Sequence, residues 1–246
     1  MSIQSERELA LLRIVGRIVR LALNAMAAAV APGVTTAELD AICARVLAEH
    51  GAASAPKLVY DFPGNSCISV NDEVVHGIPR NRVLREGDLV KLDVTAEKDG
   101  FFADAAVTVR VGEGSATAQS LARCAETAFH QAMRVVRPGA RVHEIGRVVE
   151  REVRSGGFSV VRDLCGHGVG RTIHEAPTVP NYFDPRNRTR LTEGLVIAVE
   201  PIIAAGGGLS VLDRDGWTVR TADHSLAAHY EQTVVVTRQG PLLVTA

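Results

Sequence analysis

The sequence alternates twice between helix-forming and strand-forming segments, and this order limits the possible fold more than any single motif does. Apolar residues recur at helical spacing early in the chain, and Pro32-Gly33 predicts the end of the first helix. Thr35 or Thr36 is expected to cap a second helix, which should stop near His50-Gly51. The expected helices cover about residues 9–31, 35–50, 116–137 and 142–155, and the expected strands cover 67–70, 89–95, 101–111, 195–199, 216–219 and 230–237.

Each half of the chain therefore contains two helices and a group of strands, which is typical of an α+β fold with an antiparallel sheet. We expect an approximate internal duplication, with halves at about residues 1–112 and 113–246. No linker or low-complexity tract divides the 246 residues, so we expect one domain over 1–246.

Composition excludes several classes of function. The chain has 27 basic and 28 acidic residues, and this balance argues against a dedicated nucleic-acid or anionic-membrane surface. Its four cysteines form no CxxC pair, which fits reduced thiols in a cytosolic protein. The N-terminus lacks the pattern of a secretory signal, and the apolar stretch 21–31 is too short to span a bilayer. We therefore expect a cytoplasmic protein.

Two aspartates flank the Asp99-Gly100 turn of a predicted hairpin. With a two-residue loop, Asp93 lies opposite Ala106 and Asp104 is its diagonal neighbour; with a four-residue loop, Asp93 and Asp104 are directly opposite. Either register puts both carboxylates on one sheet face among apolar neighbours. Two like charges there would repel unless a cation lay between them. The alternative is a solvated hairpin with two unrelated surface aspartates.

Glu200 and Glu231 each accompany an apolar strand, where an unpaired carboxylate is costly to bury. Taken singly, each glutamate could instead be an edge-strand residue or one half of an internal salt bridge. Together with Asp93, Asp104 and His167 they form a donor set suited to two divalent ions that share bridging carboxylates. The many oxygen donors favour manganese, iron or cobalt, with zinc also possible.

The segment from Cys165 to Glu175 contains His167 and His174 in a run of glycines. Imidazole is the commonest neutral metal ligand and acid–base group near pH 7, and glycine lets the backbone approach a ligand closely. This combination indicates an active-site loop. His130 and His143 fall in or near predicted helices and are expected at the surface.

Five motifs occur in order along the chain: Cys67-Ile-Ser-Val-Asn-Asp-Glu-Val-Val-His76-Gly-Ile-Pro, Lys91-Leu-Asp93-Val, Ala103-Asp104-Ala, Gly166-His167-Gly-Val-Gly with His174-Glu-Ala-Pro, and Val199-Glu200-Pro with Tyr230-Glu231-Gln-Thr. Together they resemble the motifs of type I methionine aminopeptidases of the pita-bread fold. The resemblance spans nearly the whole chain. It implies an α+β fold in which two duplicated halves are related by a pseudo-twofold axis, with an antiparallel sheet covered by helices on one face.

The resemblance also implies a dinuclear centre with two divalent ions (cobalt, manganese, iron or zinc). Its ligands would be Asp93, Asp104, His167, Glu200 and Glu231, with Asp104 and Glu231 bridging, Asp93 on one ion, and His167 and Glu200 on the other. The expected reaction is removal of the N-terminal methionine from nascent chains by a metal-activated water.

The same resemblance assigns roles to residues around the metals. His76 would lie near the scissile amide, His174 would donate to the substrate carbonyl oxygen, and Glu200 is our choice of proton shuttle. The apolar pocket for the methionine side chain would include Phe62, Cys67, His76, Ile173 and Trp217. As partners we expect polypeptide N-termini, with contact to the ribosome left open, no nucleic acid, no membrane, and a monomer.

Some positions depart from the family pattern. Ala105-Ala106 follow Asp104 where a hydroxyl residue is usual, Ala227 stands where a serine often helps bind a monovalent cation, and His229 replaces a frequent glutamine. Ile173 stands where aromatic residues are common, which suggests a looser pocket.

Two alternatives remain open. A related aminopeptidase with Xaa-Pro specificity would explain a looser pocket, although we expect no additional N-terminal domain of the kind usual in that class. A non-catalytic peptide-binding homologue would be expected to have lost one or more metal ligands, yet all five proposed ligands are present.

Overall fold

The structure, a computed structural model, describes residues 1–246. Its helices are α1 Glu6–Ala29, α2 Thr36–Glu49, α3 Ala55–Tyr60, α4 Ala116–Met133 and α5 Val142–Ser155. Local capping explains the helix starts: Ser5 accepts a hydrogen bond from Glu8 at the start of α1, and Thr35 forms a capping box with Glu38 at α2. No helix combines the length and apolar character that crossing a membrane would require.

The strands form one large sheet and two small ones, and all their pairings are antiparallel. The large sheet contains β1 Ala53–Ser54, β2 Cys67–Val70, β4 Leu89–Lys98, β5 Phe101–Arg110, β7 Cys165–Gly168, β8 Glu175–Pro180, β9 Val196–Val199, β14 Glu231–Thr237 and β15 Gly240–Leu243. Its order is β1-β4-β5-β14-β9-β7-β8, with β2 also beside β4 and β15 beside β14.

The two small sheets extend the structure next to the large one. One has the order β13-β10-β6 and the other β11-β12-β3. Their strands are β3 Glu73–Val75, β6 Ser159–Val160, β10 Ile202–Ala204, β11 Ser210–Leu212, β12 Val219–Thr221 and β13 Ala227–His229.

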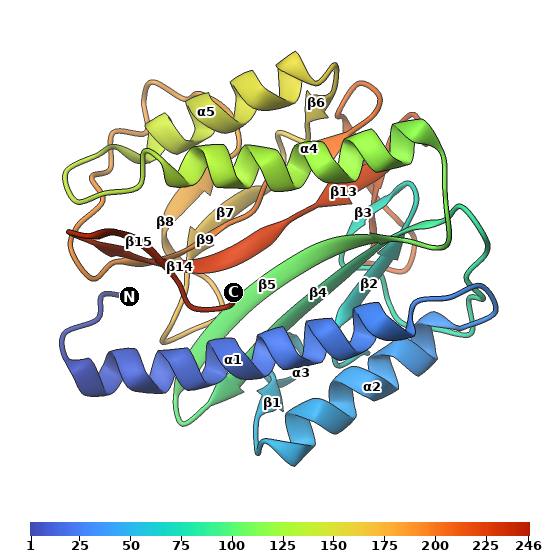
Figure 1. The fold of residues 1–246 in the computed structure, drawn as a ribbon, viewed down its shortest axis with the longest axis horizontal. Coiled ribbons are helices and arrows are strands. Elements are labelled where there is room, and N and C mark those ends of the chain that lie inside the picture. Colours follow the sequence, from blue (N-terminus) through green and yellow to red (C-terminus); the bar gives the residue numbers. More distant parts are fainter.

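Both helix pairs lie on the same side of the large sheet. Figure 1 shows α1 and α2 alongside the β4–β5 hairpin, and α4 and α5 alongside the strands of the second half. On β4, Leu92, Val94 and Ala96 are buried in one core with residues of α1 and α2. Ile197 and Val199 of β9 are buried in a second core with α4 and α5.

This arrangement confirms the predicted α+β pita-bread fold, with two helix pairs on one face of an antiparallel sheet. Because side chains alternate along a strand, the residues between these core positions point to the opposite face. That face, which the helices leave uncovered, carries the polar residues described below.

Several sequence expectations need correction. The helix predicted to reach residue 137 ends at Met133. The next three amides, of Arg134, Val135 and Val136, donate to the carbonyl three residues earlier, which makes a tighter turn before Pro138. The strand predicted over 216–219 begins at Val219, after a turn with Gly216 at φ 79°. The loop predicted over 165–175 is strand β7, a turn and the start of β8; its glycines hid the strand signal.

His143 was expected at the surface and is instead buried on α5, with its ring 5.4 Å from that of Phe183. The four cysteines are all free, as the wide spacing predicted.

Candidate metal centre

A first row of paired residues crosses the uncovered face of the large sheet. Cys67 pairs with Asp93, Asp93 with Ala106, and Ala106 with Glu231. Directly opposite residues of antiparallel strands share a face, so all four side chains project to the same side. The small side chain of Ala106 leaves space between the two carboxylates.

Glu200 joins this row from the strand next to β14. Val199 pairs with Gln232, and the next step of the antiparallel register places Glu200 beside Glu231. Glu200 is buried, and its backbone carbonyl accepts a 2.8 Å hydrogen bond from the side chain of Asn181. This bond ties the residue after β9 to the residue after β8.

A second row runs parallel to the first, two residues further along the strands. Thr95 pairs with Asp104, Thr233 pairs with Ala198, and Ala198 pairs with His167. The Thr233 hydroxyl joins the two parts of this row: it accepts from the Asp104 amide and donates to the Asp104 carbonyl, both at 2.8 Å. Asp104 and His167 therefore project on the same face as the first row.

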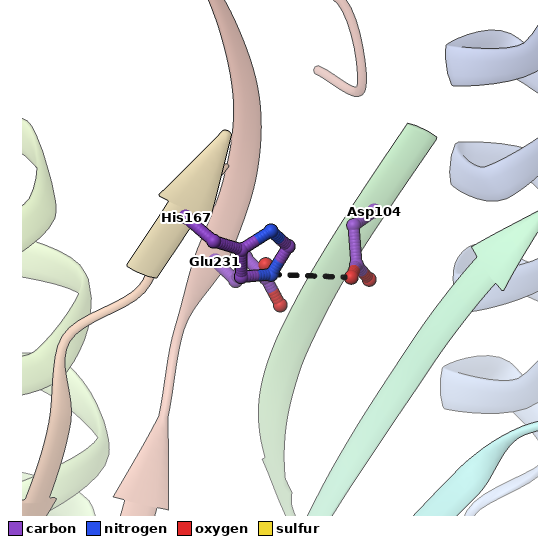
Figure 2. A group of neighbouring side chains, drawn as sticks. All are labelled: Asp104, His167 and Glu231. Atoms are coloured by element: carbon purple, nitrogen blue, oxygen red, sulfur yellow. Dashed lines mark ion pairs between the residues drawn. The ribbon is translucent and has the colours of Figure 1, made fainter. Parts of the chain in front are cut away.

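The hairpin has the two-residue loop of the two registers that the sequence allowed. Lys98 pairs with Phe101, so Asp104 is the diagonal neighbour of Asp93. Figure 2 shows Asp104, His167 and Glu231 converging from β5, β7 and β14. The ligand atoms of these three residues lie within 4.8 Å of one another, and those of Glu200, His229 and Glu231 form a second such group.

Backbone contacts fix the orientation of His167. Its Nδ1 lies 2.9 Å from the carbonyl oxygen of Gly168, so Nδ1–H donates and Nε2 keeps its lone pair. Nε2 faces the carboxylates, 3.5 Å from Glu200 Oε1 and 4.0 Å from Asp104 Oδ2. Burial, followed by the nearby His174, lowers the pKa of His167 to about 4, so this ring is neutral near pH 7. Glycine permits this strand, because a Cβ on Gly166 would lie 2.4 Å from the carbonyl oxygen of Ala198.

The carboxylates are held in a setting that opposes their ionisation. Burial, and then the charge of Asp104, raises the pKa of Asp93 to about 8. Burial also raises the pKa of Asp104 and of Glu200 well above the usual range, with Glu231 as the next cause for both. Burial and the charge of Asp93 do the same to Glu231. Without a cation, this cluster would hold several protons at neutral pH.

The donor set fits divalent cations. Asp104 Oδ1, Glu231 Oε1 and both ring nitrogens of His229 are buried and have no hydrogen-bond partner in the protein. Buried polar atoms normally have a partner, and leaving them without one is costly. Cations shared among these atoms would satisfy the oxygens and remove the repulsion between the carboxylates.

The cluster forms the polar floor of a cavity of about 620 Å³. All the sequence-predicted site residues line this cavity: Phe62, Cys67, His76, Asp93, Asp104, His167, Ile173, His174, Glu200, Trp217 and Glu231. The Phe62 and Trp217 rings meet edge to face at 5.2 Å, while Cys67 and Ile173 are buried beside them. Burial raises the pKa of the Cys67 thiol well above its usual range, so Cys67 is a pocket wall and not a nucleophile.

Tyr60 was missed by the sequence reasoning. It ends α3 and lines the cavity, where its hydroxyl lies 2.7 Å from Nδ1 of His174. If the hydroxyl donates, Nε2 of His174 carries the ring proton and is free to donate to a ligand. The scarcity of aromatic residues in the chain, 4%, was the only sequence signal that could have singled Tyr60 out.

His76 occupies a strained position beside the cavity. Its backbone has φ 57°, the left-handed region that residues other than glycine rarely adopt. The following Gly77 donates to the Ser69 hydroxyl at 3.0 Å, and a Cβ on Gly77 would lie 2.3 Å from the carbonyl oxygen of Ile68. Close packing against β2 therefore sets the direction of the His76 side chain.

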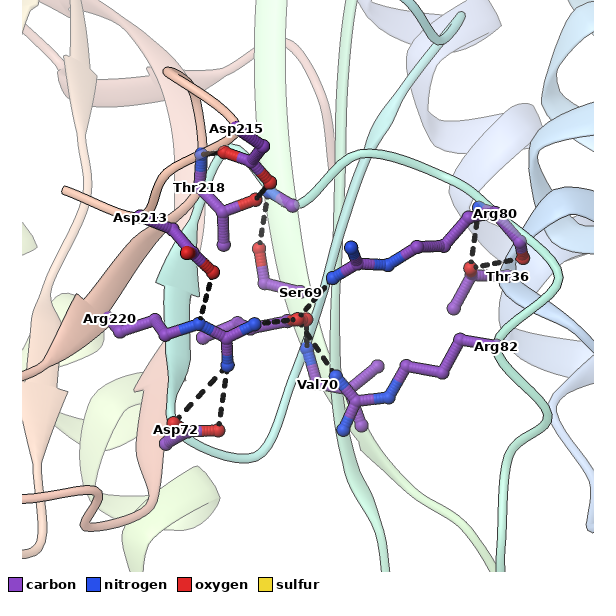
Figure 3. Close-up of polar contacts among 12 residues, drawn as sticks. Thr36, Ser69, Val70, Asp72, Arg80, Arg82, Asp213, Asp215, Thr218 and Arg220 are labelled. Carbon is purple, nitrogen blue, oxygen red and sulfur yellow. Dashed lines mark hydrogen bonds and ion pairs between the residues drawn. The ribbon is translucent and has the colours of Figure 1, made fainter.

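An ion cluster around the buried Glu73 connects β3 with β12 and with residues 80–82. The carboxylate of Glu73, whose side chain is 2% exposed, pairs with Arg80, Arg82 and Arg220. Figure 3 shows the side chains of these three arginines pointing toward one another. The three guanidinium groups lie 2.8–2.9 Å from Glu73 Oε1. Arg220 also pairs with Asp72, so β12 and β3 are joined by charge as well as by backbone pairing.

The turn that carries Trp217 is held next to this cluster. The Asp215 carboxylate accepts from the amides of Trp217 and Thr218 at 3.0 and 2.8 Å, and from the Thr218 hydroxyl at 2.7 Å. Arg220 binds Asp213 at 2.6 Å on the other side of the same turn. These contacts fix the turn whose Trp217 ring meets that of Phe62 in the cavity wall.

A model of metallopeptidase family M24 matches residues 10–238 of the chain. The chain belongs to this family. It is 45% identical over 247 aligned positions to methionine aminopeptidase 2 of Bacillus subtilis, and the match covers 100% of the chain and 99% of that protein. The family resemblance inferred from the five motifs is therefore confirmed.

Solved structures agree with this assignment. The crystal structure of methionine aminopeptidase from Thermotoga maritima has a TM-score of 0.96 and 35% identity, covering 100% of this chain and 99% of that one. Prolidase from Pyrococcus horikoshii has a TM-score of 0.79 at 22% identity, and the match covers 99% of this chain and 63% of that one. That second likeness shows the shared fold alone. Membership of a metallopeptidase family implies that the chain uses divalent metal.

Proposed function

We propose that this chain is a methionine aminopeptidase that hydrolyses the N-terminal methionine from peptides and proteins. The observation that carries the proposal is the convergence of four carboxylates and His167 at the floor of a cavity with apolar walls. The relatives that match along their full length are named methionine aminopeptidases, which supports the same reading.

Asp93, Asp104, His167, Glu200 and Glu231 would hold two divalent ions, with cobalt, manganese, iron and zinc as candidates. Bound there, the ions would supply Lewis acidity toward the peptide carbonyl and lower the pKa of an attacking water. The unpartnered oxygens of Asp104 and Glu231 support this assignment.

The remaining chemistry belongs to side chains around the cluster. Glu200, buried beside Glu231, is suited to accept a proton from the attacking water and return it to the leaving amine. His174, with Nδ1 engaged by Tyr60, would donate from Nε2 to the carbonyl oxygen as negative charge develops there. His76 would lie near the scissile amide. The walls formed by Phe62, Cys67, His76, Ile173 and Trp217 would enclose the methionine side chain and exclude water.

We also propose a domain organisation, an oligomeric state and a cellular location for this enzyme. Residues 1–246 would form a single catalytic domain whose halves share the large sheet, since β5 of the first half pairs with β14 of the second. The enzyme would act as a monomer in the cytoplasm on nascent chains.

The test is metal-dependent hydrolysis by protein first stripped with a chelator. Activity on a Met-Ala peptide should be absent from the stripped protein and return with manganese or cobalt. It should exceed activity on an Ala-Pro peptide at least tenfold in kcat/KM, roughly what an apolar side-chain pocket provides. Asp104→Asn should remove the activity, whereas Glu49→Gln, at an exposed site on α2, should not.

Failure of every divalent ion to restore hydrolysis would refute the proposal. A preference for Ala-Pro would instead establish the Xaa-Pro alternative.

A further inference from the structure

His229 is a buried imidazole with no role in the mechanism above. It ends β13, two residues before Glu231, and is 2% exposed. Its Nε2 faces the carboxylate cluster, 3.4 Å from Glu231 Oε2 and 3.6 Å from Glu200 Oε2. Neither ring nitrogen has a hydrogen-bond partner in the protein.

The two distances are informative because they are too long for hydrogen bonds. An N–H···O bond spans about 2.7–3.2 Å between heavy atoms. Two atoms that each lie about 2.1 Å from a shared cation are about 3.4 Å apart at a tetrahedral angle. The separations of 3.4 and 3.6 Å match the second arrangement.

His167 provides an internal comparison within the same cluster. Its Nε2 lies 3.5 Å from Glu200 Oε1, close to the 3.6 Å that separates His229 Nε2 from the other oxygen of the same carboxylate. The two imidazoles come from different strands, β7 and β13, and each belongs to its own group of three possible ligands.

We propose that His229 is a sixth protein ligand of the metal centre, so that the centre contains two imidazoles. This inference rests on the proposed function, since it concerns the ions that the carboxylates would hold. A second imidazole increases the nitrogen content of the donor set and shifts its preference from manganese toward cobalt, iron and zinc. The competing role is that of a hydrogen-bond donor that orients Glu200 and Glu231 without touching a metal.

Proton NMR of the protein loaded with two equivalents of cobalt(II) separates these roles. Each cobalt-bound histidine gives one strongly shifted ring N–H resonance that disappears in D₂O. We expect two such resonances in the unmodified protein, from His167 and His229, and one in His229→Gln. His76→Gln, which removes a cavity histidine outside both ligand groups, should keep both resonances.

Metal affinity gives a second readout. Zinc binding, measured by competition with a chromophoric chelator, should weaken at least tenfold in His229→Gln, while manganese binding should weaken less. Circular dichroism of the variant checks that it is folded. The resonance count in the unmodified protein decides the question even if the variant is unstable.

A single shifted N–H in the unmodified protein, with Met-Ala hydrolysis intact, would overturn this inference and leave the proposed function standing. Failure of the unmodified protein to bind cobalt or hydrolyse Met-Ala would overturn both.

Discussion

Asp104→Asn should stabilise the metal-free protein while removing its activity. The carboxylate of Asp104 is buried with like charges around it, and its ligand oxygen lies within 4.8 Å of that of Glu231. At this distance and an effective dielectric constant of about 20, two ionised carboxylates would repel by about 3.5 kcal/mol. The metal-free folded protein therefore keeps a proton on the cluster, at a free-energy cost that is absent from the unfolded chain and grows with pH. Asparagine keeps the shape and removes the charge. We therefore expect a gain of about 2–4 kcal/mol in the free energy of unfolding at pH 8.

The gain should depend on pH in a definite direction. The folded-state pKa of Asp104 is raised above the ordinary value of 3.8, so the folded protein keeps a proton that the unfolded chain has lost. Stability from this group is complete below pH 3.8 and falls as the pH rises toward the folded-state pKa. Asp104→Asn does not lose stability in this way as the pH rises. The difference in the free energy of unfolding between this variant and the unmodified protein should therefore be under about 1 kcal/mol at pH 4.5 and largest near pH 8.

Urea unfolding in the presence of a chelator measures the free energy of unfolding of both proteins at pH 4.5 and at pH 8. Glu49→Gln is the matched control, because this exposed carboxylate lies 4.0 Å from Arg45 and should change stability by less than about 0.5 kcal/mol at either pH. Adding cobalt or manganese should reverse the order, with the unmodified protein becoming the more stable. If Asp104→Asn is less stable than the unmodified metal-free protein at pH 8, the carboxylates do not repel one another as described.

Three further predictions concern residues in the cavity wall and in the ion cluster around Glu73. Tyr60→Phe should lower kcat for Met-Ala by roughly 3–10-fold with little change in KM, because it removes the hydrogen bond that orients His174. Arg220→Gln should raise KM and lower the free energy of unfolding by about 2–4 kcal/mol, because it removes one partner of the buried Glu73. Peptide kinetics measures the first effect and urea unfolding the second. Cys67 should resist iodoacetamide at pH 8 in the native protein and react in urea, because burial raises its pKa; peptide mass spectrometry checks this.

Each of these three predictions has a matched control residue in the same chain. Tyr182→Phe, at a tyrosine that packs against Arg162 away from the cavity, should leave kcat unchanged. Arg214→Gln, at an exposed arginine near Arg220, should leave KM and stability unchanged. Cys165 is only half-buried and should be alkylated before Cys67. Equal effects of variant and control would contradict the corresponding assignment.

The sequence was most informative where structure depends on neighbouring residues. A second helix capped by Thr35 or Thr36 and the Asp99-Gly100 hairpin turn were both predicted from local chemistry, and the structure places the cap at Thr35. Where a local signal was weak the prediction failed, as in the glycine-containing strand β7. His229 could have been included, since it precedes Glu231 by two residues and side chains two apart in an extended segment point the same way.

The amino-acid order by itself determined which groups could bind metal, the start of the second helix at Thr35 or Thr36, and two possible registers for the hairpin. Only the tertiary structure chose the two-residue loop, aligned Glu200 with Glu231, and turned His229 toward both of them. The physical reason is that helices and turns form from contacts within a few residues, whereas strand pairing joins distant segments whose register depends on burying one face of the whole sheet. The carboxylate–histidine cluster, which draws on β4, β5, β7, β14 and the residue after β9, therefore exists only after that pairing is complete.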